Sequence, residues 1–168
     1  PDAYGAGVSR ADQHAELDPI VRTRWSVFSG RGNVELFPQL LGLQIEDVRV
    51  DYCRMRLPHR QQIERFGGIV HGGALSALLD TVVVPAIGQA YGPDARFATV
   101  DLHVQFLSAL TDDDAVAEGW IVRRGRSTVF CEAEARAAST DRVVARSMMT
   151  YTVNPGASVT DPEQRAVR

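Results

Sequence analysis

Glycines surround one histidine where a long helix is predicted to begin, in the run Gly67-Gly68-Ile69-Val70-His71-Gly72-Gly73-Ala74. Backbone N–H groups in the first turn of a helix have no partner inside it, and glycine lets a ligand approach them closely. The helix dipole favours negative charge at the same end. The run could therefore stabilise the oxyanion that forms during acyl transfer. The alternative is a tight connection that needs glycine only for its backbone angles.

Asp80 lies eight residues further along this helix, among Leu78, Leu79 and Val82. A carboxylate in apolar surroundings costs free energy unless it is paired or functional, and partial burial makes it a stronger base. It could serve as a general base or a nucleophile, and a solvated surface acid is the alternative. His71 and Asp80 are about 13 Å apart along a helix, so they could meet only across a two-fold axis between subunits.

A predicted hairpin turn carries three arginines, Arg123, Arg124 and Arg126. Guanidinium groups suit phosphates, so this turn could bind a phosphorylated ligand, and a solvated basic turn is the alternative. Asp101 and His103 alternate along a predicted strand and could line a cleft or simply face solvent. Because no third ligand has suitable spacing, we expect no metal site. The sequence also lacks a Gly-x-Ser-x-Gly nucleophile motif and a phosphate-binding P-loop.

The elements that must position these groups follow from periodicity. Residues 72–91 carry an apolar stripe at helical spacing, with Pro85 predicting a kink. A short helix is expected in 20–30, and 34–43 is expected to form a second helical or turn segment whose length Pro38 and Gly42 limit. Alternation predicts one bent strand over 44–58, where the apolar phase slips by one residue. Four further strands are expected, joined by short turns into an antiparallel meander: 97–108, 115–123, 127–137 and 142–153. These elements predict an α+β fold, one long helix on a curved antiparallel sheet that a dimer could extend.

The 168 residues fit a single domain, which we expect over residues 20–153 between loose tails at 1–19 and 154–168. A formal net charge of −3 gives no attraction to nucleic acid, and no apolar run is long enough to suggest a membrane span. Cys53 and Cys131 are expected as buried free thiols, and no signal peptide is visible. We therefore expect a cytoplasmic protein.

The pattern Gly68-x-x-His71-Gly72-Gly73-x6-Asp80, followed by Ala98-Thr99-Val100-Asp101-Leu102 and Phe106-Leu107, resembles the PaaI-type hotdog-fold thioesterases of the 4-hydroxybenzoyl-CoA thioesterase superfamily. The similarity covers residues 36–153. It implies a hotdog fold, in which a sheet wraps a central helix and is joined across a dimer. It also implies hydrolysis of an acyl-CoA thioester to a carboxylic acid and free CoA, without metal or cofactor.

The resemblance also implies roles for individual residues. The Gly72 N–H would hold the thioester carbonyl oxygen, Asp80 of the partner subunit would be base or nucleophile, His71 would position the thioester and Thr99 would orient water. Residues expected to contact the substrate lie in the glycine run and at the arginine turn, which the resemblance places near the pocket mouth: Gly68, Val70, Gly73, Arg65, Arg123, Arg124 and Arg126. The active sites would lie between subunits of a homodimer or homotetramer.

Arg65 departs from the family pattern, because many members carry asparagine six residues before the histidine. This departure leaves an altered catalytic set open. The alternative function is therefore a hotdog protein that binds acyl-CoA or a fatty acyl group without turning it over.

Overall fold

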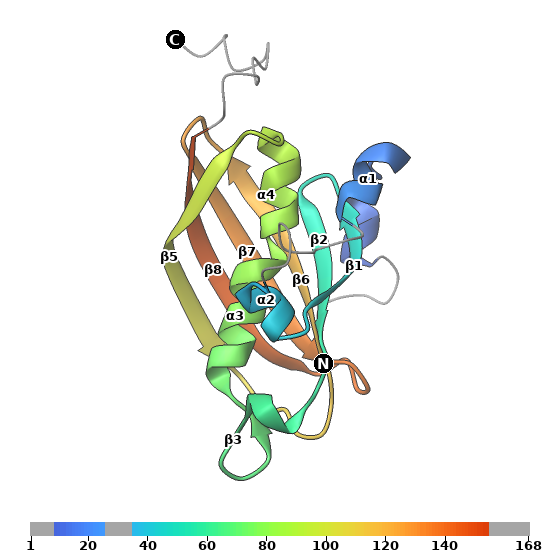
Figure 1. Ribbon diagram of the computed structural model, residues 1–168, viewed down its shortest axis with the longest axis vertical. Coiled ribbons are helices and arrows are strands. Elements are labelled where there is room, and N and C mark those ends of the chain that lie inside the picture. Colours follow the sequence, from blue (N-terminus) through green and yellow to red (C-terminus); the bar gives the residue numbers. More distant parts are fainter. Residues whose placement is uncertain (1–8, 26–34, 155–168) are drawn as a thin grey trace.

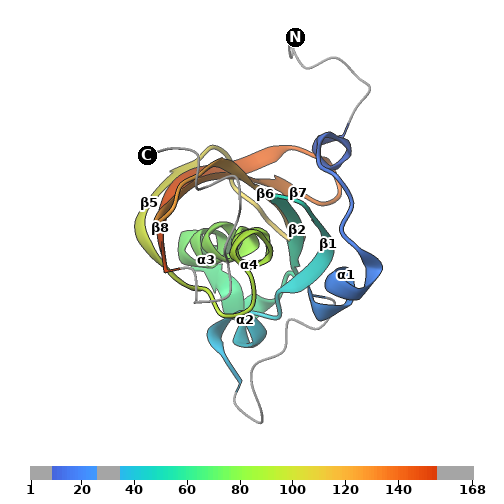
Figure 2. The same ribbon diagram turned by 90° about the horizontal axis from the view of Figure 1, so that it is seen from above.

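A computed structural model describes residues 9–25 and 35–154, in which a six-stranded antiparallel sheet curves around one long helical segment (Figures 1 and 2). The strand order is β1-β2-β6-β7-β8-β5. The strands and the helical segment have these bounds: β1 Gln44–Arg49, β2 Tyr52–Leu57, β5 Arg96–Phe106, β6 Ala115–Arg124, β7 Thr128–Ala137, β8 Val143–Asn154, α3 Gly72–Val82 and α4 Val84–Tyr91. The α+β architecture expected from the sequence, with one helix held in a curved sheet, is confirmed.

Shorter elements surround this core: η1 Arg10–Gln13, α1 Pro19–Trp25, α2 Phe37–Leu40, η2 Gln61–Ile63, β3 Glu64–Arg65 and β4 Ile69–Val70. The helix expected over 20–30 appears as α1, and residues 26–30 of that expectation lie outside the described residues. The helical or turn segment expected over 34–43 appears as the single helical turn α2, and residue 34 lies outside the described residues. Gly42, with a φ of 70°, ends it in the left-handed region that favours glycine.

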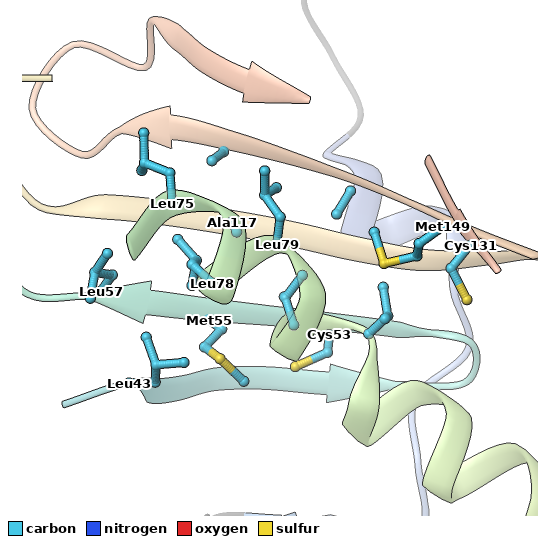
Figure 3. Packing of buried hydrophobic residues seen from close by; sticks show 14 of the residues in the cluster. Leu43, Cys53, Met55, Leu57, Leu75, Leu78, Leu79, Ala117, Cys131 and Met149 are labelled. Carbon is cyan, nitrogen blue, oxygen red and sulfur yellow. The ribbon is translucent and has the colours of Figure 1, made fainter. Parts of the chain in front are cut away.

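The long helical segment supplies the core. Leu78 and Leu79 are fully buried between the helix and the sheet (Figure 3), and Val82 is fully buried as well. A Cβ at Gly119 on β6 would lie 2.7 Å from Val82 and Val83, so a glycine is required for the helix to pack this closely. The kink predicted from proline is present, since α3 ends at Val82 and α4 begins at Val84.

By length and composition alone the segment from Gly72 to Tyr91 could cross a membrane. Its most apolar window is 56% buried within the domain, however, as expected for a core helix. The two cysteines are both buried and free, as expected. Burial raises the pKa of the Cys131 thiol to about 12, which keeps the thiol protonated and unreactive.

Two strand predictions were wrong. The single bent strand expected over 44–58 is a hairpin, in which Arg49 of β1 pairs with Tyr52 of β2 and Asp51 adopts a φ of 61°. A tight turn shifts the apolar phase as a bulge does, so the pattern fitted both. The four-stranded meander was also wrong, because only β6, β7 and β8 follow one another. Strand β5 pairs with β8 at the far edge, and residues 107–114 lead back to β6.

Residues 9–18 were expected within a loose N-terminal tail, and the structure places them beside β1. Glu16 forms a bridge to Arg49, and the Arg49 Nη1 donates to the Ala11 carbonyl oxygen at 2.8 Å. Arg10 lies over the ring of Trp120, 3.5 Å from its centroid. These contacts extend the packed part of the chain back to about Ser9.

Candidate active site

Asp80 is half-buried near the end of α3, close to the middle of the long helical segment, and two hydroxyl groups hold its carboxylate. Thr99 donates a hydrogen bond to Asp80 Oδ1 at 2.9 Å. The Tyr151 hydroxyl lies 2.7 Å from the same oxygen and 2.6 Å from the Asp80 main-chain carbonyl oxygen. Among the described residues no hydrogen bond reaches Oδ2. One carboxylate oxygen is therefore fixed, and the other can accept a proton or attack an electrophile.

A bulge in β5 brings Thr99 to the acid. Simple alternation places Thr99 on the opposite face from Val104 and Phe106. In the β5–β8 register Thr99 pairs with Tyr151 and Asp101 pairs with Thr150, so Val100 is the extra residue. The bulge reverses the side-chain phase. Thr99 therefore faces the helix on the same side as Val104, which packs on the core, and Phe106, whose ring meets Gly72.

Tyr151 is a site residue that the sequence prediction missed. Its side chain is 2% exposed. Burial, followed by the hydrogen bond to Asp80, raises the pKa of Tyr151 well above its usual value, so the hydroxyl stays a hydrogen-bond donor. The available signal was the alternation Met149, Tyr151, Val153, which points these side chains inward, where a buried tyrosine needs a polar partner.

The glycines around the start of α3 serve different purposes. Gly67 and Gly68, with φ of 96° and 72°, form the turn between β3 and β4 and need glycine for conformation. Gly72 has an ordinary φ, and a Cβ there would lie 3.1 Å from the Phe106 ring, so a larger residue would press on this ring. Backbone conformation thus explains Gly67 and Gly68, whereas the role of Gly72 in holding an oxyanion stays a prediction.

The N–H groups available at this helix start are fewer than the sequence suggested. His71 is the N-cap residue, and its Nδ1 accepts a hydrogen bond from the Gly73 N–H at 2.8 Å. The Gly73 N–H is therefore already used. No hydrogen bond of the described residues involves the Gly72 N–H, which leaves it as the candidate oxyanion donor. Because Nδ1 accepts, a neutral His71 carries its proton on the exposed Nε2.

A depression of about 310 Å³ opens beside this helix start. Its walls are mainly apolar, and Arg65 is the only charged residue among the described residues that line it: Arg65, Ile69, Val70, Gly72, Leu75, Phe106, Leu107, Ser108, Ala109 and Leu110. Arg65 is exposed and donates to the Phe66 carbonyl oxygen at 3.0 Å. Within the ranges 9–25 and 35–154 it has no carboxylate partner. The expected contacts Val70 and Arg65 thus lie at one cavity, with Gly68 in the adjoining turn.

One chain does not bring all the expected site residues together. Gly72 and Asp80 are about 12 Å apart along the helix. The arginine turn lies at the other end of the helical segment, where the Tyr91 hydroxyl donates to the Gly125 carbonyl oxygen at 2.6 Å. Within one chain this turn therefore lies at the opposite end of the helical segment from the depression, and its expected position near the mouth of a pocket shared by two subunits stays a prediction. Arg124 is also engaged, because its Nε donates to Asp51 Oδ1 at 2.8 Å, whereas Arg123 and Arg126 are exposed.

Comparisons with known proteins agree with this architecture. A conserved protein of Pseudomonas aeruginosa is 26% identical, with a TM-score of 0.68 over 72% of this chain and 95% of its own. A Haemophilus influenzae thioesterase is 18% identical, with a TM-score of 0.67 over 74% of this chain and 86% of its own. A hypothetical thioesterase of Streptococcus pneumoniae, solved with coenzyme A, is 21% identical, with a TM-score of 0.62 over 68% of this chain and 87% of its own.

Comparison with curated protein sequences gave no match. The model of the thioesterase superfamily matches residues 67–152, just over half of the chain, from the glycine run through β8. The matched region contains Gly72, Asp80, Thr99 and Tyr151. The hotdog fold implied by the sequence resemblance is confirmed, thioester hydrolysis is the general activity that these findings support, and the chain belongs to the thioesterase superfamily.

Proposed function

We propose that the protein hydrolyses an acyl-CoA thioester to a carboxylic acid and free CoA, at a site shared by two subunits. The observation that carries this proposal is the Asp80 carboxylate, which Thr99 and Tyr151 hold through Oδ1, while no hydrogen bond from the described part of the chain reaches Oδ2. The coenzyme A bound to the similarly folded Streptococcus pneumoniae protein supports CoA as the leaving group.

Asp80 can act in two ways. As a general base, Oδ2 takes a proton from water while the water oxygen bonds to the carbonyl carbon, and the C–S bond then breaks. As a nucleophile, Oδ2 bonds to the carbonyl carbon and expels the thiolate, and water then hydrolyses the resulting anhydride. In both routes the thiolate of CoA takes up a proton, and the Gly72 N–H stabilises the oxyanion of the tetrahedral intermediate.

The shared site follows from the edge of the sheet. Strand β5 is an edge strand that exposes apolar side chains: Val100 is 61% exposed, Leu102 37% and Phe106 54%. When two β5 strands pair antiparallel about a two-fold axis, the Thr99 end of one lies beside the Phe106 end of the other. Asp80 of one subunit then faces the start of α3 in its partner. We therefore propose a homodimer, or a homotetramer built from such dimers.

The same two-fold axis would bring the arginine turn of one subunit close to the site of its partner. The turn flanks the beginning of β5, because the Val153 N–H donates to the Ser127 carbonyl oxygen and Asn154 pairs with Arg96. In the antiparallel dimer this end lies beside the partner's helix start. Arg123 and Arg126 then meet the CoA phosphates, while the depression next to Gly72 receives an apolar part of the substrate.

The first experiment measures thiol release from a panel of acyl-CoA thioesters. Asp80→Asn keeps the shape of the side chain but removes the base, and we expect a loss of turnover of at least about 100-fold. Asp141→Asn, at the exposed β7–β8 turn, is the matched control and should match the wild type. If Asp80→Asn keeps a near-normal kcat while its melting temperature is unchanged, the assignment is wrong.

A second experiment tests the oxyanion donor. Proline at the first position of a helix is well tolerated, and the extended backbone of His71 suits a following proline, so Gly72→Pro removes the N–H with little change in the helix. Gly72→Ala introduces the same Cβ contact with Phe106 but keeps the N–H. We expect Gly72→Pro to lose about 10²–10³-fold in kcat relative to Gly72→Ala. Equal activities of the two variants would remove Gly72 from the mechanism.

Arg65 supports a second candidate function. It stands at the rim of the depression, where the resembling family often has asparagine. A protein that binds acyl-CoA without hydrolysing it would need the depression and the arginines but not Asp80. Calorimetric binding of acyl-CoA without thiol release, and with equal affinity in Asp80→Asn, would favour this alternative.

A further inference from the structure

Three side chains of types that commonly bind metals converge from separate segments at the base of the β3–β4 hairpin. His59 follows β2, Glu64 begins β3, and Asp112 belongs to the connection between β5 and β6. His59 Nε2 lies 2.9 Å from Glu64 Oε1, and one ligand atom from each of the three residues lies within 4.8 Å of the other two. His59 and Glu64 are half-buried and Asp112 is exposed, so an ion could enter from solvent.

The charges at this cluster are unbalanced. Two carboxylates repel each other at this separation, and the only ion-pair partner of Glu64 among the described residues is the His59 ring. No ion pair is found for Asp112 in the same part of the chain. Other acids, by contrast, have arginine partners: Asp114 lies 3.0 Å from Arg56, and Glu46 forms ion pairs with both Arg54 and Arg56. The cluster therefore lacks the positive charge that its neighbours have.

We propose that His59, Glu64 and Asp112 form a binding site for a divalent transition-metal ion such as zinc or manganese. One imidazole nitrogen with two carboxylate oxygens suits these ions, whereas calcium and magnesium prefer oxygen ligands alone. Ligand atoms around zinc lie about 3.4 Å apart, which rotation of the exposed Asp112 side chain can supply. A fixed backbone supports the site, because the His59 N–H donates to Asp114 Oδ1 at 2.8 Å.

Such an ion would act as a clamp for the segments that hold the start of α3. Thr111, next to Asp112, forms a bridge to Ile69, and the adjacent Leu110 carbonyl oxygen accepts from the Val70 N–H at 2.9 Å. The Ile63 carbonyl oxygen, next to Glu64, accepts from the His71 N–H at 2.7 Å. The role is structural, and it does not depend on the proposed hydrolase activity. Bound metal should therefore raise the melting temperature whether or not the protein hydrolyses a thioester.

The test is a calorimetric titration of the untagged, chelator-treated full chain with zinc or manganese chloride. Cobalt(II), which gives visible absorption bands when bound by imidazole and carboxylate, serves as the spectroscopic probe. We expect one equivalent to bind and the melting temperature to rise. His59→Gln and Asp112→Asn should each weaken binding by at least about 10-fold, and the double variant should abolish it. Asparagine tolerates the left-handed backbone of Asp112, whose φ is 49°, so that variant should fold normally.

His103→Gln is the matched control, because it removes an exposed histidine elsewhere on the molecule and should bind the metal like the wild type. The absence of binding to the wild type would overturn the proposal and leave a hydrogen-bonded histidine–glutamate pair. Binding of equal strength in the wild type and in Asp112→Asn would also overturn it, because the ion would then lie elsewhere. If His59→Gln fails to fold, as judged by circular dichroism, Asp112→Asn decides the question alone.

Discussion

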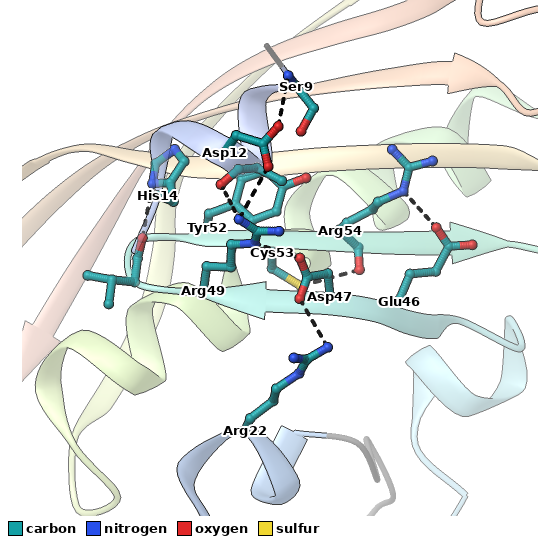
Figure 4. Close-up of polar contacts among 12 residues, drawn as sticks. Ser9, Asp12, His14, Arg22, Glu46, Asp47, Arg49, Tyr52, Cys53 and Arg54 are labelled. Carbon is teal, nitrogen blue, oxygen red and sulfur yellow. Dashed lines mark hydrogen bonds and ion pairs between the residues drawn. The ribbon is translucent and has the colours of Figure 1, made fainter. Parts of the chain in front are cut away.

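The two edges of the sheet differ in how far other parts of the chain cover them. Beside β1, residues of the N-terminal segment cover the edge: Glu16 bridges to Arg49, and the Val50 N–H donates to the Ala15 carbonyl oxygen at 2.9 Å. Arg49 also pairs with Asp47 at 2.8 Å in a group of ion pairs at this edge (Figure 4). The Arg49 end of this edge is therefore covered within one chain.

At the opposite edge, β5 has no covering segment within the described ranges, and its exposed side chains include Val100 and Phe106. An open, apolar edge strand is a template for pairing with another chain. The half-buried Asp80 of α3 lies beneath this edge and accepts a hydrogen bond from Thr99 of β5. The chain thus covers part of one edge itself, whereas the edge above the candidate acid is open, and this is the edge at which the proposed dimer would form.

The largest expected effect comes from placing a charge on the open edge. In Val100→Lys a charged side chain replaces an apolar one in the proposed interface between two β5 strands, and burying this charge without a partner costs free energy. We therefore expect light scattering to report a monomer and thiol release to fall by about 100-fold. The matched change at the covered edge is Ile20→Lys, because Ile20 on α1 is 76% exposed. That variant should keep the size and activity of the wild type. A monomeric Val100→Lys with full activity would show that each site lies within one chain.

A mixing experiment tests whether the open edge creates a shared site. Asp80→Asn and Gly72→Pro should each be nearly inactive alone. After they are unfolded and refolded together, half of the dimers are mixed, and each mixed dimer has one site with both residues intact. Activity should therefore recover to about a quarter of the wild-type value. If both residues act within one chain, the mixture stays inactive.

Removing positive charge near the beginning of β5 should have a smaller effect on activity than the changes above. Replacing Arg123 and Arg126 by glutamine should raise KM for acyl-CoA about 10-fold with little change in kcat, because the phosphate contacts are equal in ground and transition states. The rise should shrink with added salt and vanish with an acyl-pantetheine substrate, which lacks the phosphates. Arg124 is left in place because it pairs with Asp51. An equal rise for both substrates would mean that the turn acts through structure.

Sequence patterns were sufficient where periodicity is long and unambiguous. The apolar stripe of residues 72–91 identified the central helix, and Pro85 its break. Alternation identified β6, β7 and β8. The glycine run and Asp80 identified the principal candidate site residues, because both sit on this well-predicted helix.

Sequence patterns failed at both edges of the sheet, where pairing over long range decides the structure. A hairpin and a bulge shift the apolar phase equally, so β1 and β2 were predicted as one strand. Strand β5 was expected beside β6, since neighbours in sequence usually pair. The bulge at Val100 left no trace in a regularly alternating run, and this hid the contact between Thr99 and Asp80. The cluster of His59, Glu64 and Asp112 comes from three segments that only the fold brings together.

The smallest expected effect concerns the covered edge, where Glu46 on β1 accepts hydrogen bonds from Arg54 at 2.7 Å and Arg56 at 2.5 Å. Burial alone would raise the pKa of Glu46, but these two arginines outweigh it and hold the pKa below its usual value of 4.5. A lowered pKa means that this stabilisation is fully present above about pH 4.5 and is lost as the pH falls through the folded-state pKa. Glu46→Gln should lower the free energy of unfolding at pH 7 by about 1 kcal/mol or less, and by less still at pH 3.

Urea denaturation at both pH values measures this difference, with Glu35→Gln as the control, because Glu35 is exposed and has no ion pair within the described residues. Thiol release by Glu46→Gln at pH 7 should equal that of the wild type, since the covered edge is remote from Asp80 in the strand order. An equal loss of stability at pH 7 and pH 3 would mean that Glu46 acts through packing. A loss of activity without a loss of stability would contradict the division of roles between the two edges.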